Sequence, residues 1–186
     1  MSAASFKVTF KLDEDDAKYF RSLFRSAKQA AAEQDTEEIL TAARDLIASV
    51  RKNKKTPGFV IEAIETLQDL TEIIEDEHYA APAKVRAEVV AALAYFANAE
   101  DLIPDDIPVL GFLDDAIMIK FVEEQFRHEL HAFRKFRKFH RGAEQRPWTQ
   151  VASQRLPGRL AAMRAKLRAE VERKNKADVD RGRARL

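Results

Sequence analysis

The sequence predicts an all-α protein: a compact bundle of about five helices, a Pro/Asp-rich turn between two of them, and a basic C-terminal helical arm. Apolar residues recur at the i, i+3, i+4 and i+7 spacing of amphipathic helices through most of the 186 residues. Prolines lie between these stretches, where helices begin or end. Polar and apolar residues alternate in 7–12, which predicts a short extended N-terminal segment that lies over the helical body or pairs with a second copy.

Acidic caps are expected to begin the first two helices. Asp13 followed by Asp16 is a variant of the capping box, and Asp35 followed by Glu38 repeats it. Apolar stripes follow in both helices: Phe20, Leu23, Phe24 and Ala27 in the first, and Ile39, Leu40, Ala43, Leu46, Ile47 and Val50 in the second. The basic run 51–55 then lies where the negative end of a helix dipole favours cations.

Prolines mark the starts of the third and fourth helices. Thr56 and Pro57 are expected as N-cap and first residue of the third helix, because proline loses nothing where the amide has no helical partner. Pro82 marks the fourth helix, which should run to Asn98. It is apolar on several sides, so it is expected to be the central and most buried helix.

A proline-rich interruption separates the fourth helix from a long fifth one. Pro104 and Pro108 forbid a straight helix, because each lacks the amide and clashes with the carbonyl one turn back. Aspartates able to cap the next helix are Asp101, Asp105 and Asp106, and Gly111 permits a positive φ. The long helix is expected over 112–141, and Pro157 is expected to open a last helix resembling a solvated arm.

The segment from 98 to 119 resembles the signature of the YkvA-like family, a bacterial domain of unknown function. The pattern is D-x-I-P-D-x-I-P-x-x-G-x-x-D-D, here Asp101, Ile103, Pro104, Asp105, Ile107, Pro108, Gly111, Asp114 and Asp115. The resemblance extends over 6–140 and implies a mostly helical domain with a paired-helix centre and no established activity. We therefore interpret 1–141 as a YkvA-like helical domain and 142–186 as a basic linker and C-terminal helical arm.

The composition limits which cellular compartment and which kinds of chemical site can be expected. The chain contains no cysteine, which excludes disulfides, thiolate metal sites and a cysteine nucleophile. Its start has no basic region followed by an apolar run, and the most apolar window, 85–99, is shorter than the roughly 20 residues of a spanning helix. We expect no transmembrane helix and a cytoplasmic location, alternatively peripheral to the inner membrane.

Charge is divided unevenly along the chain. Residues 1–133 contain 15 Lys/Arg and 26 Asp/Glu, whereas residues 134–186 contain 17 and 5. Such asymmetry predicts that the tail meets an acidic surface, which could be nucleic acid, an anionic membrane, an acidic protein or the protein's own body. An unknown protein partner is the first expectation, and the oligomeric state is left open.

Two groups of side chains are candidates for a divalent metal. Carboxylates of Asp101, Asp105, Asp114 and Asp115 approach from the turn and the next helix, and could offer several oxygen ligands to Mg²⁺, Ca²⁺ or Mn²⁺. The alternative is that they are helix caps and turn formers. Glu124, His128 and His131 share a helical face and could hold zinc or iron, or could be solvated and locally hydrogen-bonded.

A basic surface is predicted in the segment 131–141. Its cations are Arg134, Lys135, Arg137, Lys138 and Arg141, and they alternate with Phe133, Phe136 and Phe139. Aromatic and cationic side chains together are typical of surfaces that bind nucleic-acid strands or anionic membranes. The alternative is that the phenylalanines anchor the end of a core helix while the cations stabilise its C-terminus.

No motif for catalysis or for a cofactor is found. The G-x-S-x-G motif and phosphate-binding glycine loops are missing, so no catalytic residue is proposed. We expect a non-enzymatic interaction or scaffold module that binds through the turn 102–112 and the basic arm. One alternative is a carboxylate-rich divalent-metal-binding protein or metal-dependent hydrolase. A second is a peripheral anionic-membrane or nucleic-acid binder that uses the tail.

Overall fold

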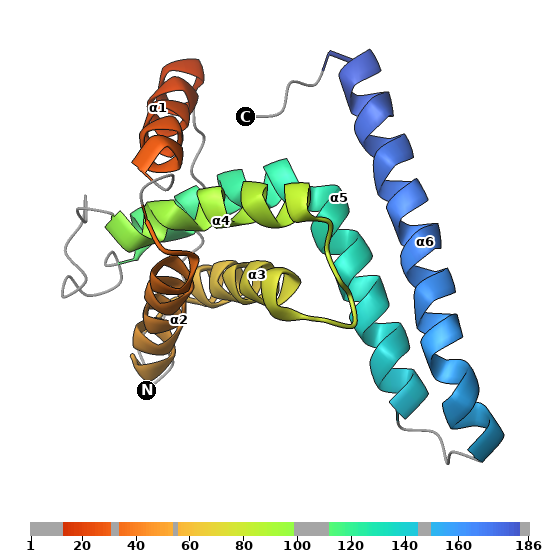
Figure 1. Cartoon of the computed structure of the whole chain (residues 1–186). Coiled ribbons are helices and arrows are strands. Elements are labelled where there is room, and N and C mark those ends of the chain that lie inside the picture. The colour runs from red at the N-terminus through yellow and green to blue at the C-terminus, as the bar shows by residue number, and fades with distance from the viewer. Residues whose placement is uncertain (1–12, 31–33, 54–55, 99–111, 145–149, 183–186) are drawn as a thin grey trace, which may run out of the picture.

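The computed structural model describes residues 13–30, 34–53, 56–98, 112–144 and 150–182. Within these ranges it has six α-helices and no strand: α1 (Glu14–Ala30), α2 (Thr36–Lys52), α3 (Gly58–Glu75), α4 (Ala83–Asn98), α5 (Leu113–Glu144) and α6 (Gln150–Asp180). The all-α class is confirmed, with α6 added to a bundle of five helices (Figure 1). The expected extended segment lies outside the described residues.

The acidic caps of α1 and α2 are confirmed. Asp13 Oδ1 accepts from the amide of Asp16 at 2.9 Å, and the amide of Asp13 donates to Asp16 Oδ2 at 3.1 Å. Asp35 accepts from the amide of Glu37 at 3.5 Å at the start of α2. These short-range contacts satisfy amides that the helices leave without partners, so the local sequence was sufficient to predict them.

The core lies around α3, which packs against α2, α4 and α5. It buries ten residues: Val60, Ala63, Ile64, Thr66, Leu67, Asp69, Leu70, Thr71, Ile73 and Ile74. The prediction that the fourth helix is the most buried is wrong, because residues 83–88 at the start of α4 are exposed or half-buried. Which helix becomes central depends on how the other helices pack, and here α3 has buried residues from Val60 to Ile74.

Thr56 does not cap α3. Its hydroxyl Oγ1 donates to the carbonyl of Val50 at 3.0 Å and to that of Asn53 at 2.8 Å, which lie at the C-terminal end of α2. Pro57 is the N-cap of α3 and has no side-chain cap bond. The prediction is therefore wrong: a hydroxyl between two helices could serve either end, and here it serves the carbonyls behind it.

Helix α6 runs antiparallel beside α5 (Figure 1). It begins at Gln150, so the prediction that Pro157 opens it is wrong. Proline removes one helical hydrogen bond, but Leu156 and Leu160 on either side pack against the core and hold the helix together. The expected solvated arm is also only partly correct, because Leu160, Leu167 and Val171 are buried.

Ion pairs fasten α6 to α5 together with this apolar stripe. Lys135 on α5 and Lys174 on α6 both bind Glu170, at 3.3 and 2.7 Å. About two turns further along α6, near its C-terminal end, Asp178 accepts from His128 Nε2 at 2.6 Å and from Arg127. The hydrogen bond with His128, and then the one with Arg127, lowers the pKa of Asp178. Both contacts therefore stabilise α6 while these carboxylates are ionised.

Acid should weaken this attachment. Hydrogen bonds from Lys174 and Lys135 lower the pKa of Glu170 from 4.5 to about 2. A carboxyl group whose folded pKa is below its unfolded pKa adds stability above the unfolded value and loses it as the pH falls through the folded one. The thermal midpoint should therefore fall between about pH 4.5 and about pH 2. Glu170→Gln should flatten that part of the curve, and an unchanged curve would contradict the contact.

Candidate functional site: a charged groove between α2, α3 and α5

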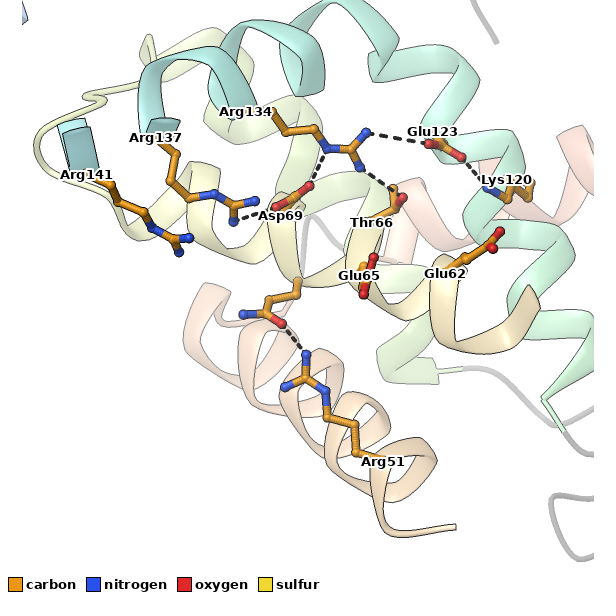
Figure 2. Close-up of a pocket in the computed structure, with 11 residues that line it drawn as sticks. Arg51, Glu62, Glu65, Thr66, Asp69, Lys120, Glu123, Arg134, Arg137 and Arg141 are labelled. Atoms are coloured by element: carbon orange, nitrogen blue, oxygen red, sulfur yellow. Dashed lines mark hydrogen bonds and ion pairs between the residues drawn. The ribbon is translucent and has the colours of Figure 1, made fainter. Parts of the chain in front are cut away.

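A charged groove lies where the C-terminal end of α2 meets α3 and α5 (Figure 2). It has a volume of about 540 Å³. The side chains around it are Arg51, Glu62, Glu65, Thr66, Gln68, Asp69, Lys120, Glu123, Arg134, Arg137 and Arg141. All of them are polar or charged, so the groove is suited to a ligand that forms ion pairs and hydrogen bonds.

Asp69 is the centre of the groove. It is 5% exposed and projects from α3 toward α5. Its carboxylate accepts from Arg134 Nε at 2.5 Å and from Arg137 Nη1 at 2.7 Å. Because both hydrogen bonds join opposite charges in a partly dry site, they hold the two guanidinium groups in defined positions.

Further contacts complete the placement of these two arginines. Arg134 Nη2 donates to Thr66 Oγ1 at 3.2 Å, and Arg137 Nη1 donates to Glu72 Oε2 at 2.8 Å. Burial alone would lower the pKa of Arg137, but the hydrogen bond to Glu72 and the charge of Asp69 outweigh it and raise the pKa. Arg137 therefore remains charged despite being partly buried.

The two ends of the groove differ in charge. Lys120 is paired with Glu123 at 2.7 Å, while Arg134 and Arg137 are held by α3. The remaining cations are Arg51, which donates to the neutral Gln68, and Arg141. The remaining anions are Glu62 and Glu65, and Figure 2 shows them apart from Arg141. Neither these two glutamates nor Arg141 has an ion-pair partner among the described side chains.

The side chains of the segment 131–141, which was predicted as a basic surface, lie in several different environments. Arg134, Arg137 and Arg141 line the groove, whereas Lys135 faces α6. Lys138 is exposed. Its aromatic residues are core anchors, as one of the two interpretations held: Phe133 and Phe136 are fully buried and Phe139 is partly buried against the core.

The carboxylates of the turn are only partly within the described chain. Asp101, Pro104, Asp105, Pro108 and Gly111 lie outside the described residues. Asp114 and Asp115 are buried in the first turn of α5. There a carboxylate is favourably placed against the positive end of the helix dipole. These positions agree with a capping role and leave the metal hypothesis as a prediction.

The second candidate metal group is engaged in separate contacts. Glu124 pairs with Arg127, and His128 contacts Asp178 on α6. Burial, and then repulsion from Lys135 and Lys174, lowers the pKa of His131. Among the described residues, no three His, Asp or Glu side chains are grouped so that they could hold a metal ion.

A buried polar network beneath α6 was missed in the sequence. Glu129 accepts from the hydroxyl of Tyr79 at 2.6 Å and from Arg168 on α6. The guanidinium carbon of Arg168 lies 4.5 Å from the centre of the Tyr79 ring. Burial, and then the charge of Glu129, raises the pKa of Tyr79. No local pattern could reveal this group, because its members are about 40 to 50 residues apart.

Comparison with known families finds a match for part of this chain. Residues 85–121 match DUF1232, a family described as a protein of unknown function. Searches of curated proteins and of solved structures gave no match. The DUF1232 segment comprises most of α4, the interruption and the start of α5, and of the groove it supplies only Lys120. The groove is therefore built mainly by helices outside that segment.

No helix in the described part of the chain is long and apolar enough to cross a membrane. The long helices α5 and α6 carry charged residues along their whole length. A polar residue is costly in the hydrocarbon core, so such sequences are poor spanning segments.

Proposed function

We propose that this chain is a YkvA-like protein of the bacterial cytosol that acts as a non-enzymatic interaction module, binding a segment of a partner protein in the charged groove. The observation that carries the proposal is the fixing of Arg134 and Arg137 by the buried carboxylate of Asp69. A binding site gains affinity when its charged side chains are already in position, because less side-chain freedom is lost on association.

The charges that remain available define the partner. Arg141 favours an acidic group at one end of the groove, and Glu62 favours a basic group at the other. Arg51 and Glu65 lie between them in Figure 2 and add one charge of each sign. A polypeptide with acidic and basic residues at separate positions satisfies both ends. The opposite order of charges would bring like charges together, which costs several kcal/mol and gives specificity.

Exposed apolar side chains next to the acidic end also favour a protein partner. Phe59 and Ile61 lie beside Glu62 in the first turn of α3 and are 42% and 37% exposed. Aromatic and aliphatic anchors at the edge of a polar groove are typical of protein interfaces, whose affinity depends on a few such residues.

Native mass spectrometry tests the proposal on untagged protein purified from its own cells without chelator. The wild type should carry a second polypeptide at a fixed stoichiometry. Arg51→Glu with Arg141→Glu should reduce the complex about 10-fold or more, because both cations become repulsive. Lys166→Glu with Arg173→Glu is the matched control: it makes the same change in charge on exposed positions of α6 and should retain the complex.

Two results would overturn the proposal. A mass excess equal to a cation, lost in Asp114→Asn with Asp115→Asn while the helical content is kept, would favour the metal-binding alternative. Saturable turnover of a substrate by the purified protein would remove the non-enzymatic assignment.

A further inference from the structure

The outer face of α6 carries a continuous stripe of exposed cations. We define the basic stripe by its five members: Arg155, Arg159, Lys166, Arg173 and Lys176. At about 100° of rotation per residue, all five lie within an arc of about 100°, and at about 1.5 Å per residue they extend over roughly 32 Å. They therefore point in one general direction along most of the helix.

The residues between these cations are small. Gly158, Ala162 and Ala169 are the other residues within the arc, so between Arg155 and Lys176 it contains neither an acidic residue nor a large apolar one. The acidic residues beside the stripe are Glu170, which two lysines already neutralise, Glu172 outside the arc, and Asp180, which lies within the arc one turn after Lys176. Five cations against one terminal carboxylate leave this helix face positive.

Other cations of α6 serve a different purpose. Arg164 donates to the carbonyl of His78 at 2.7 Å, and Arg168 binds Glu129. These contacts fasten the opposite side of α6 to the body. In the stripe, Arg159 has a contact of this kind with the described part of the chain, its guanidinium carbon lying 5.5 Å from the centre of the Phe139 ring. The helix is thus held by one set of cations and presents another to solvent.

We propose that the basic stripe is a docking surface for an anionic lipid bilayer, on which α6 lies flat. Figure 1 shows α6 as an extended rod at the edge of the molecule, with α5 on one side. A row of cations with one orientation can face the phosphates of a flat membrane at the same time, and each Lys or Arg near such a surface adds to the attraction. The attraction is electrostatic, because the stripe has no apolar side chain to insert.

A nucleic acid fits this surface less well. An α-helix is about 10 Å wide, so the packed α5 and α6 pair is too wide for the major groove, which is about 12 Å across. Binding of single strands usually requires stacking on exposed aromatic rings. Phe133 and Phe136 are buried, and the stripe contains no aromatic residue.

Sedimentation with vesicles tests the docking surface on the full chain. Vesicles of phosphatidylglycerol and phosphatidylcholine in equal parts should bind the protein at low salt, and vesicles of phosphatidylcholine alone should not. Added salt should release it. Lys166→Gln with Arg173→Gln should weaken binding about 30-fold, at the usual contribution of a surface cation. Arg51→Gln with Arg141→Gln, which removes the same charge from the groove, should bind as the wild type does.

Three outcomes would overturn the proposal. The first is a lack of binding to phosphatidylglycerol vesicles at low salt. The second is binding that the Lys166/Arg173 variant leaves unchanged, while circular dichroism shows that its helices are intact. The third is stronger binding to duplex DNA than to the vesicles, lost in the same variant, which would assign the stripe to nucleic acid. None of these outcomes depends on the charged groove, so the two proposals can fail separately.

Discussion

Replacing Glu129 with leucine is expected to lower the free energy of unfolding by about 3–5 kcal/mol. The change removes the acceptor of the Tyr79 hydroxyl and the charge partner of Arg168. Arg168 would then remain as an unpaired cation beneath α6, with 19% of its side chain exposed. An uncompensated charge in such a position costs more than the lost hydrogen bonds alone. Urea unfolding followed by circular dichroism measures the loss.

Two controls separate this effect from a general loss of charge. Glu124→Leu removes a carboxylate that is largely in solvent and paired with Arg127, so it should cost less than about 1 kcal/mol. Glu129→Leu combined with Arg168→Met removes both charges and should recover much of the loss. A Glu129→Leu protein with the stability of the wild type would show that the network is not formed.

The second large effect is expected at Phe136. Phe136→Ala should lower the free energy of unfolding by about 3–5 kcal/mol, because the ring is fully buried and its removal leaves a cavity. The ring lies 5.3 Å from that of Tyr79, between centroids. Chemical denaturation of the variant measures the cost.

Phe59→Ala is the matched control for this prediction. Phe59 is 42% exposed, so the same change in side chain should cost less than about 1 kcal/mol. If Phe136→Ala were equally mild, Phe136 would belong to a surface, and the interpretation of the segment 131–141 as core anchors would be wrong.

Local features of the fold could be predicted from the sequence. The caps at Asp13 and Asp35 and the burial of Phe133 depend on residues two to four positions apart, so spacing alone reveals them. Thr56 and Pro157 were misread for a related reason. A hydroxyl between two helices can serve either, and a proline near a helix start can also lie within the helix when its neighbours are anchored.

The site could be predicted only in part. Arg134 and Arg137 were identified as basic residues, but their partner Asp69 is 65 and 68 positions away and meets them only because α3 and α5 pack together. No spacing within α5 indicates that contact. The same holds for Tyr79 and Glu129. They meet only because α5, which carries Glu129, crosses the segment after α3, which contains Tyr79.

The uneven charge of the chain is partly explained by internal pairing. Arg168 of the basic tail binds Glu129, and Lys135 binds Glu170, so some tail cations are neutralised within the protein. The cations of α6 are therefore divided between two roles: those facing the body hold α6 in place, while the basic stripe faces solvent. Of these two groups on α6, the basic stripe is the one that offers charge to a partner outside the chain.

Photo-crosslinking in living cells tests the central claim, that a partner protein occupies the charged groove, most directly. Benzoylphenylalanine would replace Ile61, which is 37% exposed beside the acidic end, and in a control Val179, which is 68% exposed on α6. We predict a single protein adduct from position 61 that disappears with Arg51→Glu and Arg141→Glu, and none of the same mass from position 179. An adduct that survives the charge reversal, or no adduct from position 61, would contradict the assignment of the groove.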